Sequence, residues 1–248
     1  MAGPTRQSPP PARASSRPAG AGIEASTAVT TFLIAWVLAQ FASFAVLGAL
    51  GAAGEPTATI SIPVLGTALL VTWAVYVGSM WVSSRQSGSG DFIGDYAVRF
   101  RPIDSAGLVI GALSQLVLVP LVYLPLQEIW PETFDDEKVQ ETAKDLVDRA
   151  SGGSALLLVG LVVVGAPLVE ELFYRGLLQG PLAARYNPAV VVIGVAALFA
   201  LIHFRPVEYP GLFAFGLVLG VCALRTGRLG MPIAAHVGFN AAGLVVAL

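Results

Sequence analysis

The chain has 248 residues, of which 55% are hydrophobic and only 12% are charged. Soluble domains carry about 25% charged residues, so this composition excludes an ordinary soluble fold and indicates a polytopic membrane protein. The net charge of -2 gives no electrostatic basis for binding nucleic acid. The single cysteine, Cys222, excludes an internal disulfide and cannot build a thiolate metal site alone.

The N-terminal residues 1–22 are rich in Pro, Ala, Ser and Gly. They cannot bury a core, so we expect a disordered tail. A signal peptide is not expected, because the first apolar run begins late and exceeds the usual h-region of about 7–15 residues. The preference for Arg over Lys, with abundant Ala and Gly, indicates a GC-rich bacterial genome.

Apolar runs predict an all-α bundle of about seven transmembrane helices, with an eighth or re-entrant segment as the alternative. Gly216 and Gly220 form a GxxxG pattern that favours close helix approach in the sixth span. Pro120 and Pro125 predict kinks in the third. The seven expected spans are residues 28–50, 60–82, 106–126, 154–178, 188–204, 211–224 and 231–248.

The segment 128–149 is the acidic part of the chain. Its apolar residues fall at helical spacing and predict an amphipathic surface helix. Thr133, followed three residues later by Asp136, resembles a capping box at the start of this helix. The simplest interpretation of the segment is a solvated face with no specific role.

Basic residues orient the spans, because cytoplasmic loops are richer in Lys and Arg. With the N-terminus inside and Arg175 left out as part of a span, nine basic residues lie in cytoplasmic segments and four lie outside. We therefore expect a multi-pass protein of the cell membrane, with its N-terminus in the cytoplasm and its C-terminus and acidic segment outside. The inner set is Arg6, Arg13, Arg17, Arg85, Arg99, Arg101, Arg185, Arg225 and Arg228, and the outer set is Lys138, Lys144, Arg149 and Arg205.

A few ionisable residues lie well inside the last four expected spans. A charge at bilayer depth costs roughly 3 kcal/mol, and such residues usually face a protein interior or a water-filled cavity and have a function. Two histidines and a carboxylate pair in one bundle therefore indicate a functional site rather than packing alone. The set comprises Glu170, Glu171, Arg175, His203 and His236.

Helical spacing predicts different roles for the two adjacent glutamates, Glu170 and Glu171. Glu171 and Arg175 are four residues apart, in the order that favours an ion pair on one helix. Glu170 points about 100° away, without a partner on its own helix, and is the candidate general base. Pro167, one turn earlier, removes an amide from the helical ladder, and the resulting kink could admit water.

Two further pairs share helix faces. Phe199 lies four residues before His203, and His236 lies four residues before Asn240. His236 and Asn240 offer two polar donors at one point, as an oxyanion site requires. At about 1.5 Å per residue, Glu170, His203 and His236 lie about 15, 22 and 8 Å from the cytoplasmic boundary. Helix tilt can absorb several ångströms, so we expect a shared site between the cytoplasmic half and the middle of the membrane.

These three spacings resemble the motifs of the CPBP family, the CAAX-protease and bacteriocin-processing membrane proteins, also called the Abi or type II CAAX prenyl endopeptidase family. The resemblance covers roughly residues 150–248, with the motifs in order and each on its own span. It divides the chain into the tail 1–22, accessory helices with the acidic segment at 23–149, and a catalytic domain at 150–248. The motifs are Glu170-Glu171-x3-Arg175, Phe199-x3-His203 and His236-x3-Asn240.

The resemblance implies a glutamate-dependent intramembrane endopeptidase that acts on a membrane-associated peptide or protein. Glu170 and His203 would activate water, and His236 and Asn240 would stabilise the oxyanion, with Glu171, Arg175 and Phe199 as structural support. The family's description as metalloproteases leaves a Zn²⁺ site of Glu170, His203 and His236 as the alternative. Because the chain has no HExxH motif, a reaction without cofactor is favoured.

Two other classes of function compete with this hypothesis. A non-catalytic scaffold or bacteriocin-immunity protein could keep the same residues for structure. A small transporter is less favoured, because no inverted repeat is visible and the polar groups cluster in one half of the chain. The sequence names neither the substrate nor the oligomeric state.

Overall fold

The computed structural model describes residues 22–248, so the expected tail lies outside the described residues except for Gly22. Between residues 22 and 248 the chain forms helices and no strand. Six helical stretches in this range are long and apolar enough to cross a membrane. The prediction of an all-α membrane bundle is therefore confirmed, and the protein is multi-pass.

The first two spans are single helices, and the next two are composite. Short helices connect them: η1 (Thr57–Thr59), α3 (Phe92–Asp95) and α6 (Asp136–Arg149). The spans are α1 (Ala25–Ala49); α2 (Ile62–Ser87); a stretch of η2 (Pro102–Ser105), α4 (Ala106–Leu113), η3 (Ser114–Leu118) and α5 (Val119–Ile129); and a stretch of α7 (Gly153–Val159), η4 (Gly160–Gly165), α8 (Ala166–Glu170), η5 (Glu171–Gln179) and α9 (Gly180–Arg185).

The last two spans are η6 (Pro206–Glu208) with α11 (Tyr209–Thr226), and α12 (Gly230–Ala247). Before them runs α10 (Pro188–Leu201), which has only 14 residues. At 1.5 Å per residue it is about 21 Å long, against about 30 Å of hydrocarbon. The fifth expected span, residues 188–204, is therefore present as a helix but is too short to cross by itself.

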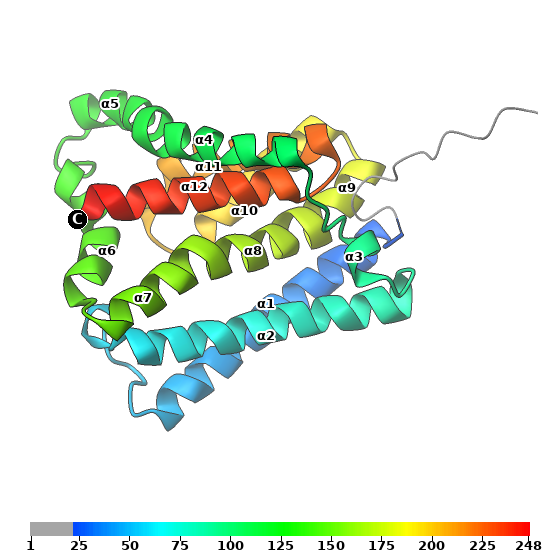
Figure 1. Ribbon diagram of the computed structural model, residues 1–248, viewed down its shortest axis with the longest axis horizontal. Helices are drawn as coiled ribbons and strands as arrows, with labels where there is room; N and C mark the ends of the chain where they lie inside the picture. Colours follow the sequence, from blue (N-terminus) through cyan, green and yellow to red (C-terminus); the bar gives the residue numbers. More distant parts are fainter. Residues whose placement is uncertain (1–21) are drawn as a thin grey trace, which may run out of the picture.

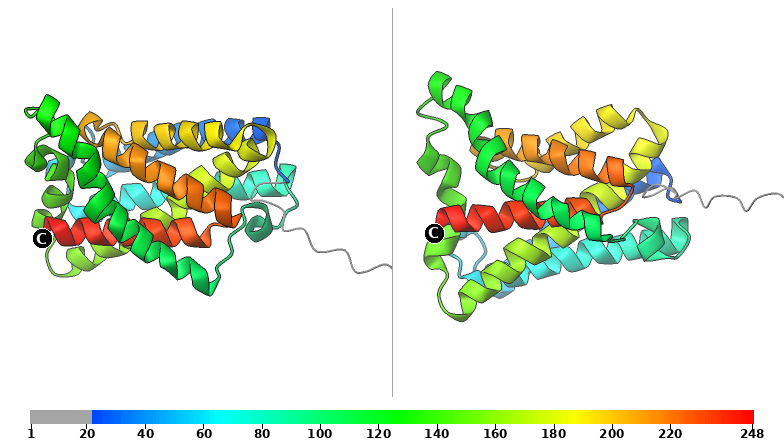
Figure 2. Two further views of the ribbon diagram at one scale, coloured as in Figure 1. Left: turned by 90° about the horizontal axis from the view of Figure 1, so that it is seen from above. Right: turned by 45° about the horizontal axis from the view of Figure 1, so that its top comes forward.

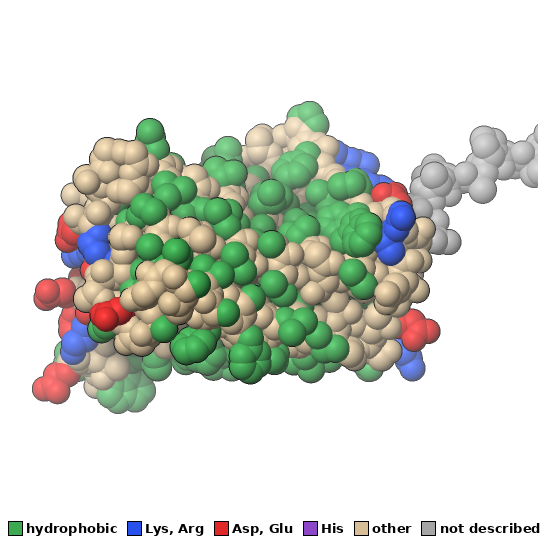
Figure 3. Space-filling model, turned by 90° about the horizontal axis from the view of Figure 1, so that it is seen from below, with side chains coloured by type: hydrophobic (Ala, Val, Ile, Leu, Met, Phe, Trp, Pro, Cys, Tyr) green, Lys and Arg blue, Asp and Glu red, His purple; other side chains and the backbone are tan. Residues whose placement is uncertain are grey.

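The helices run roughly along one direction, so that the connecting segments gather at two ends of the molecule (Figures 1 and 2). On the face seen in Figure 3, charged side chains lie at these two ends, and a belt of apolar and uncharged surface separates them. Large apolar side chains such as Phe41 (70% exposed) and Val109 (62%) point outward from the spans. This distribution matches a bundle surrounded by lipid.

Helix α12 packs along α4, and the two lie side by side in Figure 1. Two glycines make this crossing close. A Cβ at Gly111 would lie 1.7 Å from the carbonyl oxygen of Ala235, and one at Gly238 would lie 2.1 Å from that of Leu108. The third span is thus tightly joined to the segment that carries the sequence motifs.

Aromatic stacking joins the first two spans to the fourth. The ring of Phe173 in η5 stacks on Tyr76 of α2, with centroids 3.9 Å apart, and on Phe32 of α1 at 4.4 Å. All three side chains are buried. The helices α1 and α2, which carry no motif, therefore support the helix that carries Glu170 and Glu171.

The acidic segment forms α6, as predicted, but the capping box at Thr133 is wrong. The N-cap is Asp135, whose carboxylate accepts a hydrogen bond of 2.8 Å from the backbone N–H of Lys138. The aspartate satisfies the N–H three residues after itself, as Thr133 was expected to do for the N–H of Asp136, so the helix begins two residues later than predicted. Helix α6 lies at the end of the molecule where the chain terminates (Figure 1).

Candidate active site

A buried ion pair forms the base of the site. Glu171 Oε1 lies 3.0 Å from Arg175 Nη1, and both side chains are fully buried. Arg175 also donates from Nη2 to the carbonyl oxygen of Gly216 at 3.3 Å, and its guanidinium lies over the ring of Phe199. The pair has the predicted partners, but its backbone is the π-helix η5 rather than an α-helix. π-Helical turns are rare in proteins overall, but those that occur are often found at functional sites.

His236 of α12 lies against both glutamates. Its Nδ1 is 2.8 Å from Glu171 Oε1, and its Nε2 is 3.9 Å from Glu170 Oε2. Because a carboxylate only accepts hydrogen bonds, the bond to Glu171 assigns a proton to Nδ1 and aims Nε2 at Glu170. Glu171 thus orients the imidazole, a role that its spacing from Arg175 did not predict.

The two glutamates differ in exposure. The Glu170 side chain is 23% exposed, whereas the Glu171 side chain is fully buried. Glu171 is occupied by Arg175 and His236. Glu170 ends α8, where it is the carboxylate of the pair that solvent can reach. The structure therefore places the two carboxylates in the different environments that their spacing predicted.

The ring of Phe199 in α10 connects the two histidines. Its centroid lies 4.9 Å from that of His203 and 5.8 Å from that of His236, both edge to face. His203 follows the end of α10, and its Nδ1 is 2.6 Å from the carbonyl oxygen of Phe199. This bond assigns a proton to Nδ1 and leaves Nε2 as the basic nitrogen. Among residues 22–248, no hydrogen bond or ion pair joins His203 to Glu170.

Asn240 satisfies a carbonyl group that a proline leaves free. In the π-helix η4 the N–H of Ala166 bonds the carbonyl of Leu161, five residues earlier. The next bond in this register would join residue 167 to Val162, but Pro167 has no N–H. Asn240 Nδ2 donates to the Val162 carbonyl instead, at 2.7 Å. The amide has two hydrogens, so one remains for another acceptor.

The zinc alternative requires Glu170, His203 and His236 to converge. Within the described part of the chain, no group of three or more His, Cys, Asp or Glu residues is placed so that it could hold a metal ion. Of the three, Glu170 and His236 lie 3.9 Å apart, between Glu170 Oε2 and His236 Nε2. Metal dependence stays a question for experiment, and no step is assigned to a metal.

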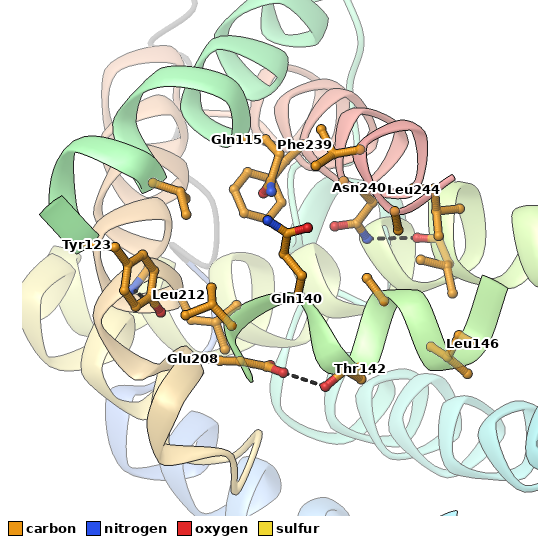
Figure 4. Close-up of a pocket in the computed structure, with 18 residues that line it drawn as sticks. Gln115, Tyr123, Gln140, Thr142, Leu146, Glu208, Leu212, Phe239, Asn240 and Leu244 are labelled. Carbon is orange, nitrogen blue, oxygen red and sulfur yellow. Dashed lines mark hydrogen bonds between the residues drawn. The ribbon is translucent and has the colours of Figure 1, made fainter. Parts of the chain in front are cut away.

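A cavity of about 280 Å³ opens beside Asn240 (Figure 4). Its walls come from η3, α5, α6, α11 and α12, together with Val162. Helix α6, for which the simplest interpretation was a solvated face with no specific role, forms one wall, with Gln140 and Leu146 among its lining residues. The cavity lies at the α6 end of the bundle, away from the end where α9 and α3 lie (Figure 1).

Two polar contacts were missed by the sequence analysis. Gln179 Nε2 donates to the carbonyl oxygen of Gly220 at 2.9 Å, one turn after Arg175 contacts Gly216. The GxxxG pattern therefore lets α11 approach η5 closely enough for polar side chains to reach its backbone. The available signal was the spacing of residues 171, 175 and 179, three polar side chains four residues apart in an apolar helix.

One comparison with known proteins finds a match, and it lies in the C-terminal region. Residues 152–242 match the family model described as type II CAAX prenyl endopeptidase Rce1-like. No curated protein and no solved structure matches the chain. The matched residues include the glutamate pair, both histidines and Asn240.

Proposed function

We propose that the chain, whose residues 152–242 match the Rce1-like family model of type II CAAX prenyl endopeptidases, cleaves peptide bonds in the membrane with water activated by Glu170. The family match supports a CAAX-type intramembrane endopeptidase. A single observation carries the finer proposal. Glu170 is the accessible carboxylate beside His236, and Glu171 and Arg175 hold that histidine from the other side. The substrate class that fits is a membrane-associated peptide or protein.

The reaction proceeds by attack of water on the scissile carbonyl. Glu170, assisted by His203 Nε2, takes one proton from water while the oxygen bonds to the carbonyl carbon. The oxyanion then accepts a hydrogen bond from the second Nδ2 hydrogen of Asn240, and His236 stabilises the developing negative charge beside it. The carbon–nitrogen bond breaks as the proton passes from Glu170 to the leaving amine. Because no hydrogen bond or ion pair joins His203 to Glu170 in the described structure, the proposal requires the two to come closer when substrate binds.

The proposed reaction needs no metal. If Zn²⁺ held by Glu170, His203 and His236 activated the water instead, chelation would remove activity and added Zn²⁺ would restore it. The measurement is cleavage by purified protein after treatment with a strong chelator, with the metal content determined in parallel. Retained activity in metal-free protein supports the proposal, and loss with recovery on adding zinc contradicts it.

The general test compares membranes that contain the wild-type protein, Glu170→Ala or His203→Ala. New protein termini found with the wild type should disappear with both variants, while the variants insert and fold normally. Glu137→Ala is the matched control, because Glu137 is exposed on α6. If both active-site variants produce the same termini as the wild type, the assignment is wrong.

A further inference from the structure

The cavity beside Asn240 presents three carboxamide groups in apolar surroundings. Gln115 comes from the π-helix η3, Gln140 from α6 and Asn240 from α12, and Figure 4 shows all three side chains in the lining of the cavity. The carboxamide of Gln115 lies over Gly243, 3.7 Å from where a Cβ would stand. The remaining lining is mainly apolar, with Val119, Leu212 and Leu244 among its residues.

Two of these carboxamides have no partner in the described structure. Between residues 22 and 248, the Gln115 and Gln140 side chains make no hydrogen bond, although each is only partly exposed. The only charged side chain in the lining, Glu208, is paired with Thr142 at 2.6 Å and with Arg205 at 2.8 Å. The cavity thus offers neutral donors and acceptors without a free charge, which argues against an ionic ligand.

This chemistry matches the main chain of a peptide. A carboxamide donates and accepts hydrogen bonds, as does each backbone amide of an extended chain, and in an apolar setting those amides need partners. An isoprenoid or acyl chain would instead leave the carboxamides unpaired and cost free energy. The volume is near the lower limit of small-ligand pockets, about 300 Å³, so only a short segment fits.

We propose that this cavity binds an extended segment of the substrate polypeptide, whose main chain pairs with Gln115, Gln140 and Asn240. The inference rests on the proposed function. Asn240 lies one helical turn from His236, so the bound segment leads from the cavity to Glu170 and His236. Helix α6 supplies Gln140 and forms the outer wall, which makes this helix part of the substrate site.

The first test measures binding apart from cleavage. The probe is a fluorescent, farnesylated peptide with a CAAX end, titrated into Glu170→Ala protein in lipid nanodiscs. Gln115→Leu and Gln140→Leu, each added to this protein, should weaken binding about threefold to tenfold, since each removes one hydrogen-bonding group of nearly unchanged size. Gln86→Leu is the matched control, because Gln86 is exposed on α2 and far from the cavity, and it should leave the affinity unchanged.

The second test replaces single backbone amides of the probe with esters, which removes one N–H at a time. At one position the ester should weaken binding to the Glu170→Ala protein, and should cause no further loss when Gln115→Leu or Gln140→Leu is also present. The peptide site would be overturned if the ester and the leucine substitutions weakened probe binding independently, or if both leucine variants kept the affinity of the Glu170→Ala protein. It would also be overturned if farnesol alone displaced the probe completely. If the probe binds as expected but membranes with the wild-type protein and with Glu170→Ala contain the same protein termini, the proposed function is contradicted and the peptide site is not.

Discussion

At the scale of single residues, His236 lies between two carboxylates. Glu171 orients the ring through Nδ1, and Glu170, which is accessible to solvent, lies beside Nε2. Glu171 and Arg175 share an ion pair with no exposure to solvent, and breaking such a pair leaves an uncompensated buried charge. The same glutamate fixes the ring of His236. Stability and activity are therefore coupled through Glu171.

We expect Glu171→Ala to lower the free energy of unfolding by about 3–5 kcal/mol, because Arg175 loses its counter-charge. Denaturant titration in mixed micelles measures this change. The double variant Glu171→Leu with Arg175→Met should recover most of the stability but no activity, since His236 still lacks its acceptor. Wild-type stability in Glu171→Ala would contradict the ion-pair role.

Asp95, outside the membrane-spanning segments, predicts a pH effect. It is 6% exposed and accepts hydrogen bonds from Ser84 Oγ at 2.6 Å and Ser89 Oγ at 2.7 Å. Burial alone would raise the pKa of Asp95, but the hydrogen bonds from Ser84 and Ser89 lower it overall. Its folded pKa is thus below the unfolded value of about 3.9, so its stabilisation is present above about pH 4.

As the pH falls through the folded pKa of Asp95, this stabilisation should be lost. Thermal unfolding of the detergent-solubilised protein between about pH 3 and 6 measures the effect. Asp95→Asn should have a lower unfolding midpoint at neutral pH and a weaker dependence below pH 4, whereas the exposed Asp148→Asn should behave as wild type. An identical acid profile for Asp95→Asn would exclude this contribution.

At the scale of elements, irregular helices determine where the site residues stand. Pro167 leaves the Val162 carbonyl free, and Asn240 supplies the missing donor from another helix. Asn240→Ala should therefore destabilise the protein by about 1–3 kcal/mol through an unsatisfied carbonyl. In Pro167→Ala, the new N–H can bond Val162, so Asn240→Ala should cost less there. A double-mutant cycle of unfolding free energies tests this, and additive effects would contradict it.

The crossing of α4 and α12 gives a second prediction at this scale. Gly111→Ala would place a Cβ 1.7 Å from the Ala235 carbonyl oxygen, so the helices must separate. We expect a loss of about 1–3 kcal/mol in unfolding free energy, with reduced activity because α12 carries His236. Gly78→Ala is the control, since a Cβ there meets nothing within 4 Å and helix propensity favours alanine. Equal stability of the two variants would contradict the close crossing.

At the scale of the whole molecule, more of the basic residues between 22 and 248 lie at the α3 and α9 end than at the α6 end, where α6 carries Lys138, Lys144 and Arg149. The connections around α3 and α9 and after α11 carry Arg99, Arg185 and Arg228, whereas α6 lies at the opposite end. We therefore propose that the α6 end, with the cavity, faces away from the cytoplasm. In this orientation the cavity opens away from the cytoplasm, and the expected position of the catalytic residues between the cytoplasmic half and the middle of the membrane stays a prediction.

A reporter fused after Leu248 tests this orientation. The C-terminus lies at the α6 end (Figure 1), so a phosphatase that works only outside the cytoplasm should be active there, and a fluorescent protein that fails to fold outside should be dark. The same reporters fused after Arg185 should give the reverse result. Fluorescence at the C-terminus would invert the proposed topology and the side from which substrate enters.

The sequence predicted the features that depend on local spacing. The spans follow from apolar runs, and the Glu171–Arg175 pair follows from a separation of four residues. It could not predict the bond between Glu171 and His236, because those residues are 65 positions apart and meet only when α12 packs. The end of α10 was also missed: the apolar run continues to Phe204, but the chain turns after Leu201, and Phe204 adopts a positive φ of 54°.

The shortness of α10 has a consequence for the surrounding bilayer. Val190 and Ile193 are more than half exposed, so lipid meets this helix directly, and a bilayer accommodates a short helix by thinning. Thinning brings headgroups and their hydration closer to His203, which follows the last turn. Hydrolysis consumes one water molecule for every bond cleaved, and the hydrocarbon layer holds almost none. A helix of 14 residues therefore shortens the path by which the reaction obtains its second substrate.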